Sequence, residues 1–463
     1  MGGLAIRERQ SEMLEGSIAK PILLFFFPIL FGSIFQQLYN TVDAIVVGNF
    51  VGKEALGAVG GSTGTLIDLL VGFVVGLSSG ATVVVAQYYG SSEAEGVRKG
   101  VSAAMFLAIS FGAVLSVLGI FFARQILVLL NVPSEILPYS VTYLRIYLLG
   151  MIPVLIYNNG AGILRAIGDS KRPLYFLVTS ALTNIVLDLL FVIVFKLGVA
   201  GVALATMISQ SVACFLTLYT LSHTTDIYQF RFREMQLDMK VFSRILVIGF
   251  PMGIQSCMYA VSNLFIQRGV NAYGTDTVAA YTAFGKIDGL FWNSSNALGQ
   301  SCLTFCGQNF GAGNVERVKK GIRTGMIIYV IGALGISGFL YMFCGTFFRL
   351  FTPEMSVIEI ATGVMRFVCP YWAVFSIVEI LSSSLRACGD SFIPMVMTTL
   401  VMGVFRVCWI LFYPAHVLHD TLLCYPISWT VLAVMYAVYY LQGGWLKRSL
   451  HQRELLMQAN QKK

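Results

Sequence analysis

The sequence predicts an all-α integral membrane protein in which twelve transmembrane helices form two parallel six-helix repeats. Three observations lead to this prediction: the composition is strongly apolar, apolar segments of spanning length recur along the chain, and motifs of the first half return in the second. Of the 463 residues, 57% are hydrophobic and 12% are charged, whereas a soluble domain has about 25% charged residues. We therefore expect most of the chain to lie in a bilayer.

Apolar runs of spanning length extend from residue 21 to residue 446, and about 20 such residues cross a hydrocarbon core of about 30 Å. They predict helices over 21–46, 55–87, 97–122, 139–162, 174–195, 198–221, 245–268, 277–306, 321–345, 358–383, 392–413 and 422–445. The expected organisation is an N-terminal tail over 1–20, a six-helix lobe over 21–222, a linker over 223–244, a second lobe over 245–446 and a C-terminal tail over 447–463.

The net charge of +8 is distributed by loop. Of the 31 Lys and Arg residues, 22 fall in the even-numbered loops and the two tails, and 5 fall in the odd-numbered loops. Because cytoplasmic loops carry the excess of basic residues, both termini are predicted to be cytoplasmic. This distribution also argues against a nucleic-acid partner, since the basic residues are sorted by loop.

Three motifs of the first half return in the same order in the second half. The segment 87–90, Gln-Tyr-Tyr-Gly, returns as Gln-Asn-Phe-Gly at 308–311, and Leu-Arg-Ala-Ile-Gly-Asp at 164–169 returns at the same offset as Leu-Arg-Ala-Cys-Gly-Asp at 385–390. Phe27-Pro28 returns as Phe250-Pro251. Since each half holds an even number of helices, the repeats are expected to be parallel.

The glycines of these motifs stand where apolar helices give way to basic residues. We expect Gly90, Gly311, Gly168 and Gly389 to be left-handed caps at helix ends, a conformation that glycine adopts more easily than other residues. Within the second helix, the spacing of Gly72, Gly76 and Gly80 predicts close packing against another helix.

Acidic residues inside spans are costly in a bilayer and are therefore candidates for function. Five occur: Asp43, Asp68, Asp188, Asp288 and Glu379. No partner for Asp68, Asp288 or Glu379 can be named from spacing, and Lys286 and Asp288, two residues apart, do not face each other on a helix.

Asp43 and Asp188 are predicted to reach the same depth in the outer half of the membrane, because both lie on helices that run outward. Asn184 shares the helix face of Asp188, and Thr206 lies on the returning helix, so the four residues could meet in one pocket. Two carboxylates in such a pocket either exchange a proton or share a cation, for which H⁺ or Na⁺ is expected. Hydrogen-bonded structural roles are the alternative. The repeat places Ile266 and Trp409 at the corresponding positions, so only the first half carries the pair.

Other residues in the spans are candidates for contact with a solute. We place Tyr39 with the coupling residues, and Gln36, Asn158, Asn159, Phe291 and Glu379 with a substrate pocket. The polar members of this set could equally bond neighbouring helices. The nine cysteines form no CxxC motif or metal-ligand cluster, and no nucleophile with a base appears, so neither a metal cofactor nor an enzyme is predicted.

Over essentially its whole length the sequence resembles the multidrug and toxic compound extrusion (MATE) transporters. The paired Leu-Arg-Ala-x-Gly-Asp motifs, the Gln-x-x-Gly turns and Asp43 followed by Gly48 and Gly52 carry the resemblance. It implies two six-helix lobes around a central cleft in the plasma membrane of a prokaryote. Similarity is greatest to the DinF-like branch, whose coupling residues match Asp43, Asn184, Asp188 and Thr206.

The resemblance implies an antiporter that exports amphipathic, mostly cationic compounds as a monomer. A flippase for a lipid-linked precursor is the alternative of the same architecture. Such a protein is expected to hold a pyrophosphate with arginines, for which Arg145, Arg366 and Arg406 are the candidates.

Overall fold

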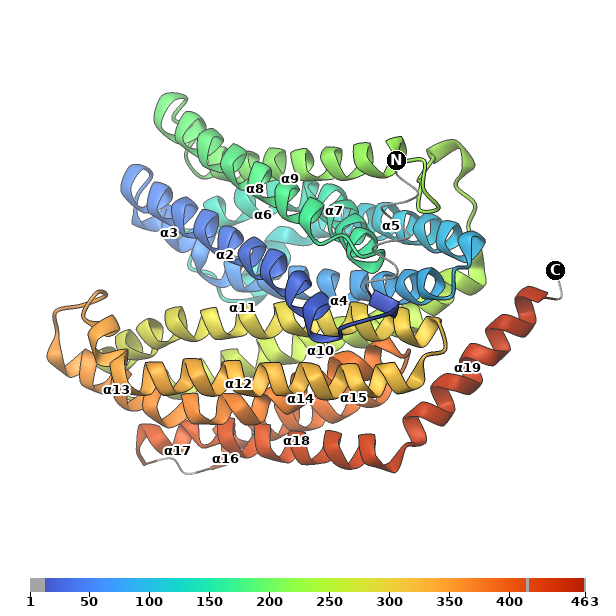
Figure 1. The fold of residues 1–463 in the computed structure, drawn as a ribbon. Coiled ribbons are helices and arrows are strands. Elements are labelled where there is room, and N and C mark those ends of the chain that lie inside the picture. Colours follow the sequence, from blue (N-terminus) through green and yellow to red (C-terminus); the bar gives the residue numbers. More distant parts are fainter. Residues whose placement is uncertain (1–12, 414–415, 462–463) are drawn as a thin grey trace. The chain divides into compact units, whose positions relative to one another are not determined.

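The computed structural model describes residues 13–413 and 416–461, which form helices and connecting turns without a strand (Figure 1). Every predicted span coincides with helical structure. Within the described residues, ten helices are long and apolar enough to cross a membrane, and the bent pair α6 (Leu137–Leu149) and α7 (Met151–Ala166) would supply an eleventh. The predicted span at 277–306 is a helix of 37 residues, α11 (Thr275–Gly311), but it is not apolar enough to be counted among these helices. Its Thr, Ser, Asn and Gln residues lower its hydropathy.

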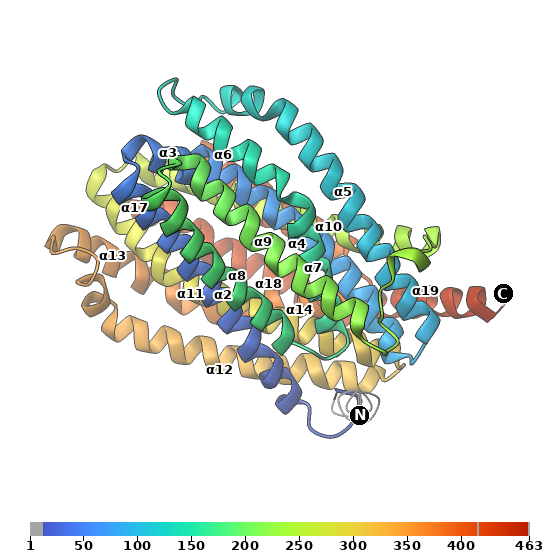
Figure 2. The ribbon, with the colours of Figure 1, turned by 90° about the horizontal axis from the view of Figure 1, so that it is seen from above.

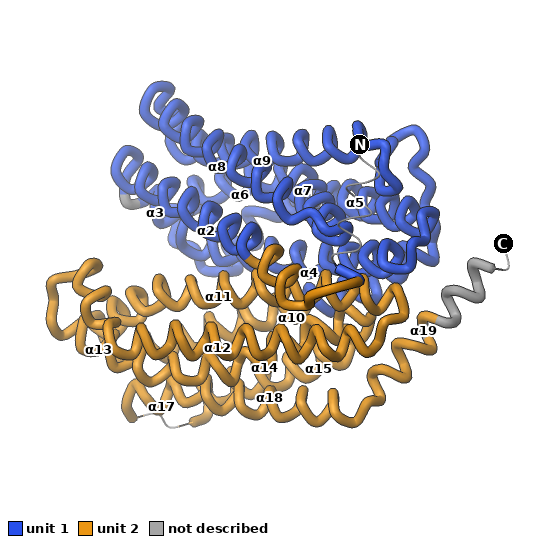
Figure 3. Tube along the Cα trace, viewed as in Figure 1, with its two compact units in different colours: residues 1–14, 27–253 blue, residues 15–26, 254–463 orange. Residues whose placement is uncertain are grey.

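The chain divides into two compact units, residues 1–14 with 27–253 and residues 15–26 with 254–463 (Figure 3). The helices of the first half are α2 (Ala19–Phe50), α3 (Lys53–Gly60), α4 (Ser62–Gly90), α5 (Ala94–Leu129), α6, α7, α8 (Lys171–Asp188), the π-helical η1 (Leu189–Val194) and α9 (Gly198–His223). In Figure 2, α8 and α9 run side by side, and they form the most extensive helix pair of this unit.

The second half begins after a short 3-10 turn, η2 (Phe232–Glu234), with α10 (Met239–Asn271). It continues with α11, α12 (Val315–Phe348), α13 (Met355–Val368), the 3-10 turn η3 (Cys369–Tyr371), α14 (Trp372–Ala387), α15 (Phe392–Thr398), the π-helical η4 (Thr399–Phe405), α16 (Arg406–Phe412), α17 (Leu418–Leu422), α18 (Cys424–Gln442) and α19 (Gly444–Gln461).

The boundary between the units falls inside two helices, whereas the sequence predicted lobes over 21–222 and 245–446. The first half of α10 packs with unit 1 because glycines let its backbone approach α4. A Cβ added to Gly76 would lie 2.6 Å from Gly253 Cα, and one added to Gly80 would lie 2.6 Å from Gly249 Cα. The close helix packing predicted for Gly76 and Gly80 is therefore confirmed.

Residues 15–26, which include the start of α2, belong to unit 2 for a different reason. The Arg317 guanidinium on α12 donates hydrogen bonds to the carbonyl oxygens of Glu15 (2.8 Å) and Gly16 (2.9 Å). These bonds attach the segment that precedes α2 to helix α12 of unit 2.

The glycine caps agree with the prediction at two of four positions. Gly168 (φ +99°) and Gly389 (φ +95°) are left-handed, as predicted. The prediction for Gly90 and Gly311 is wrong, because α4 and α11 continue through them and the left-handed residue comes two positions later, at Ser92 (φ +59°) and Gly313 (φ +82°). The two glycines still occupy crowded, buried ends of their helices.

The fourth span of each half is broken at the same place. The axes of α6 and α7 bend by 47° around Gly150. In the second half, η3 interrupts the equivalent helix and ends at Tyr371, which corresponds to Gly150 at the offset of the repeated motifs. A shared break supports duplication, since it depends on local backbone geometry that the two halves have in common.

Candidate functional site

Asp43 and Asp188 come together inside unit 1. Asp43 lies on α2 and is 7% exposed, and Asp188 is the last residue of α8 and is fully buried. Their carboxyl groups interact directly with each other, as predicted from their depths. Asn184, one helical turn before Asp188, is also fully buried, so the site gathers two carboxyl groups and one amide from two helices.

The polar atoms of this site are short of hydrogen-bond partners. Asp43 Oδ1, both carboxyl oxygens of Asp188 and both side-chain polar atoms of Asn184 are buried without a hydrogen bond. Two ionised carboxylates only accept hydrogen bonds, so neither can satisfy the other. A shared proton, or a small cation that takes oxygen ligands, would complete the arrangement.

The backbone changes form directly beyond Asp188. The π-helical segment η1 begins at Leu189, so the acid stands at the last residue of regular α-helix. Such widened turns are rare and are frequently found at functional sites. In the second half the π-helical segment η4 ends at Phe405, and the charged residue beside it is Arg406 rather than an acid.

Tyrosines lie near the acids. Tyr39, one turn before Asp43 on α2, is 6% exposed and interacts with Asp43, Gln36 and Gln210. Tyr143 on α6 is 7% exposed and interacts with both Asp43 and Asp188. The sequence reasoning missed Tyr143; the one available signal was its spacing of four from Tyr147, which puts both rings on one helix face.

The remaining residues predicted for unit 1 have separate environments. Thr206 on α9 is 6% exposed and donates its hydroxyl to the Val202 carbonyl. Gln36 is exposed, and the half-buried Asn158 donates to the Val154 carbonyl. Asn159 is fully buried and donates to Ser78 Oγ at 3.1 Å, a bond between α7 and α4. Asn159 thus offers no exposed surface to a substrate in this conformation.

Three residues predicted from the second half lie in unit 2. Glu379 on α14 accepts a hydrogen bond from Ser383 Oγ (2.9 Å) and lies 3.7 Å from the Arg386 guanidinium. Asp288 on α11 accepts a hydrogen bond from Trp292 Nε1 (2.8 Å), while its Oδ1 is buried and unbonded. Phe291 is 2% exposed and stacks on Trp372 with ring centroids 4.3 Å apart.

Arg406 is a buried cation whose environment the sequence did not reveal. It is 1% exposed, donates from Nε to Ser428 Oγ at 2.8 Å and lies over the Tyr425 ring at 4.7 Å. Arg406 is therefore buried inside unit 2. Among the described residues, no group of three or more His, Cys, Asp or Glu side chains is arranged to hold a metal ion.

Phe291→Ala is expected to lower the free energy of unfolding by about 3 kcal/mol, because it removes the ring that stacks on Trp372 and leaves a cavity. Thermal unfolding of the purified protein in detergent measures the loss. Phe291→Leu, which keeps much of the volume, should lose clearly less. Equal losses for the two variants would show that the stacking on Trp372 and the cavity do not determine the loss of stability.

The family model MatE matches the chain twice, over residues 28–190 and 251–410. The probable multidrug resistance protein YpnP of Bacillus subtilis is 28% identical over 408 residues, which cover 87% of this chain and 88% of that protein. A protein of Shewanella oneidensis named as an FAD transporter is 23% identical and covers 81% of this chain and 83% of its own length. Among solved structures, a MATE protein in the bent conformation superposes with a TM-score of 0.87 at 22% identity, covering 95% of this chain and 99% of its own.

These matches confirm the predicted family and the membrane fold, and the double match follows the two repeats. With the apolar helices, they identify a multi-pass protein of a prokaryotic membrane. The DinF-like branch and the orientation of the termini stay predictions. The chain belongs to the MatE family, that of the MATE transporters.

Proposed function

We infer that this protein is a secondary antiporter that exports amphipathic drugs or toxic compounds in exchange for H⁺ or Na⁺ by alternating access. The observation that carries the proposal is the pair Asp43 and Asp188, buried together with unbonded oxygens. An ionised pair of this kind is unstable in a low-dielectric site unless a proton or cation joins it. Binding of a proton or cation to the two carboxylates is therefore expected to change how the surrounding helices pack.

The asymmetry of the two halves supports a single coupling site in unit 1. The second half has Ile266 and Trp409 at the repeat positions of the two acids, and the buried charge beside its own π-helical segment η4 is Arg406. A buried cation cannot bind H⁺ or Na⁺ in exchange for a substrate. We expect the acids Asp288 and Glu379 of unit 2 to serve structure or substrate contact.

Drug export is supported by relatives named as multidrug resistance proteins. The relative named as an FAD transporter indicates that substrates differ in charge within the family. The transported compounds proposed from the sequence are mostly cationic.

The alternative, a flippase for a lipid-linked precursor, has less support from the arginines. Arg145 donates to the Ile120 carbonyl and Arg366 to the Tyr341 carbonyl, both through Nε. Arg406 is buried inside unit 2. The three side chains come from separate helices with separate local partners, so they supply no clustered site for a pyrophosphate.

The test is transport in proteoliposomes loaded with ethidium, with a pH gradient and then a sodium gradient imposed separately. We expect one of the two gradients to drive ethidium movement against its own concentration gradient, because the site binds one type of ion productively. Protein-free liposomes are the control. If neither gradient drives movement of this or other amphipathic dyes, the antiport proposal is wrong.

A further inference from the structure

Unit 2 contains an apolar cavity between α11 and α12 with a volume of about 540 Å³. Its lining includes Phe291, Phe339, Phe347 and Phe351, and it has one charged residue, Lys286. Ligand pockets for drug-sized molecules have volumes of about 300–1,000 Å³. The cavity is thus large enough for an aromatic compound of two or three rings.

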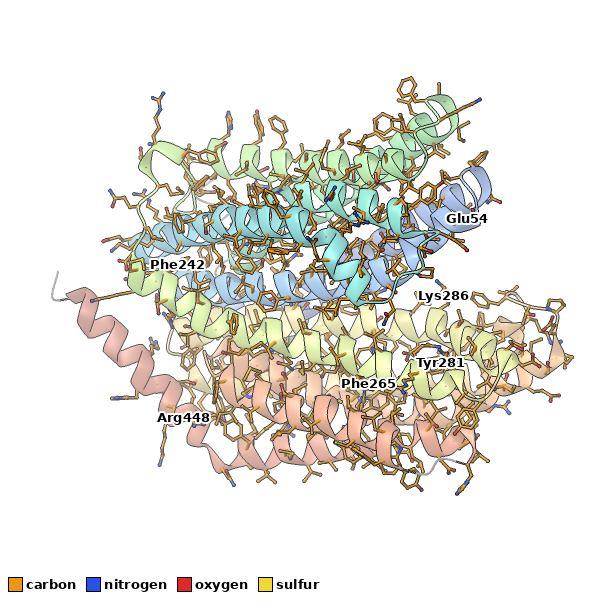
Figure 4. The ribbon with its side chains drawn as sticks, turned by 180° about the vertical axis from the view of Figure 1, so that it is seen from behind. Glu54, Phe242, Phe265, Tyr281, Lys286 and Arg448 are labelled. Atoms are coloured by element: carbon orange, nitrogen blue, oxygen red, sulfur yellow. The ribbon has the colours of Figure 1, made fainter. Side chains whose placement is uncertain are left out.

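Lys286 has no counter-charge in the described part of the chain. Its side chain is exposed and makes no ion pair there. The neighbouring Asp288 faces elsewhere on α11, toward Trp292; Figure 4 labels Lys286 on this helix. The other acids near the same helices are already bonded, Asp276 to Ser356 Oγ and Glu379 to Ser383 Oγ.

The depth of Lys286 can be read from the antiparallel pair α11 and α12. Lys286 precedes the end of α11 at Gly311 by 25 residues, and Leu340 follows the start of α12 at Val315 by 25 residues. The two residues therefore lie at the same depth along the antiparallel pair. Exposed apolar residues follow α12 and its end from Ile327 to Phe351. At about 1.5 Å per residue, Lys286 is roughly 20 Å from the level of Ile327 and about 16 Å from that of Phe351. Lys286 therefore lies near the middle of the apolar band.

A charged lysine at this depth needs water and a partner. Ionisable residues in membrane spans almost always face the protein interior or a water-filled cavity, and mark pathways for solutes. Lys286 lines a cavity whose walls also include four phenylalanines, and its ammonium group provides the one positive charge in that otherwise apolar lining. A ligand that complements this cavity carries a negative charge on an aromatic body.

We propose that the α11–α12 cavity binds amphipathic anions, with Lys286 Nζ as the counter-charge for a carboxylate or sulfonate and the phenylalanines as the wall for its aromatic part. The proposal rests on the proposed transport function and extends its substrates from cations to acidic and zwitterionic aromatic compounds. A phospholipid is a poor occupant, because its phosphate lies at the membrane interface, about 15 Å from the centre of the hydrocarbon core.

The experiment is isothermal titration of the purified full-length protein in detergent with two probes that share one aromatic body. Naphthalene-1-sulfonate carries a negative charge, and 1-naphthylmethylammonium carries a positive one. Lys286→Met keeps an apolar stem but removes the charge, so we expect about tenfold weaker binding of the sulfonate and unchanged or tighter binding of the ammonium probe. Lys286→Arg should retain sulfonate binding.

Lys320→Met, which replaces an exposed lysine near the start of α12, is the matched control and should behave as the parent protein. The proposal is overturned if Lys286→Met binds the sulfonate as the parent does, or if it loses both probes equally. It is also overturned if phosphatidylglycerol at an equimolar amount displaces the sulfonate, since the occupant is then a lipid. The titration uses no ion gradient, so its failure is separate from failure of the antiport proposal.

Discussion

Asp188→Asn is expected to reduce gradient-driven transport by about 5- to 150-fold, the range given by coupling free energies of about 1–3 kcal/mol. Asparagine has nearly the size of aspartate but neither binds a proton at its side chain nor carries the charge that attracts a cation. The variant should still fold, because it removes a costly buried charge rather than a bonded one. Dye efflux from proteoliposomes, with thermal unfolding measured alongside, tests both statements. Asp43→Asn should give the same result.

Asp288→Asn is the matched control for this prediction. Asp288 is an acid of a membrane span in unit 2, and asparagine can still accept the hydrogen bond from Trp292 Nε1 through its side-chain oxygen. We expect Asp288→Asn to keep most of the gradient-driven transport. An equal loss in Asp288→Asn and Asp188→Asn would contradict a coupling site confined to the first half.

Gly249→Ala is expected to destabilise the protein by about 1–3 kcal/mol, the cost of forcing an extra methyl group into a packed interface. A Cβ at this position would lie 2.4 Å from the Leu77 carbonyl oxygen and 3.2 Å from Leu77 Cα. Both are backbone atoms of α4, so the clash cannot be relieved by rotating a side chain, and the first half of α10 must move away from α4. The loss is measured as a lower unfolding temperature in detergent.

Gly332→Ala on α12 serves as the control, since nothing lies within 4 Å of a Cβ added there. Alanine is favoured over glycine in a helix by about 1 kcal/mol, so this variant should be neutral or slightly more stable. If Gly249→Ala is as stable as Gly332→Ala, α4 and α10 do not pack as closely as the glycine contacts require.

The membrane class, the helical segments at the predicted spans and the duplication could be predicted from the amino-acid sequence alone, because they depend on local composition and on identities repeated at offsets of 221 and 223 residues. The sequence also singled out Asp43 and Asp188 and their absence from the second half, since acids in apolar runs are conspicuous. The depth estimate was enough to predict that the two acids meet. The depth estimate was sufficient because helices that cross a bilayer run roughly along one direction, so the distance along each helix gives the depth of a residue.

The surroundings of these residues depend on how the helices pack and could not be predicted. The packing of α6 places Tyr143 near enough to interact electrostatically with both acids, and Asn159 bonds Ser78 instead of facing a cavity, because the rotation of a helix about its own axis is set by neighbouring helices. The first half of α10 belongs to unit 1 because glycine contacts with α4 outweigh sequence proximity to the rest of the second repeat. Lys286 lines the α11–α12 cavity, whereas Asp288, two residues later, bonds the half-buried Trp292; this difference depends on which helices cover each side of α11.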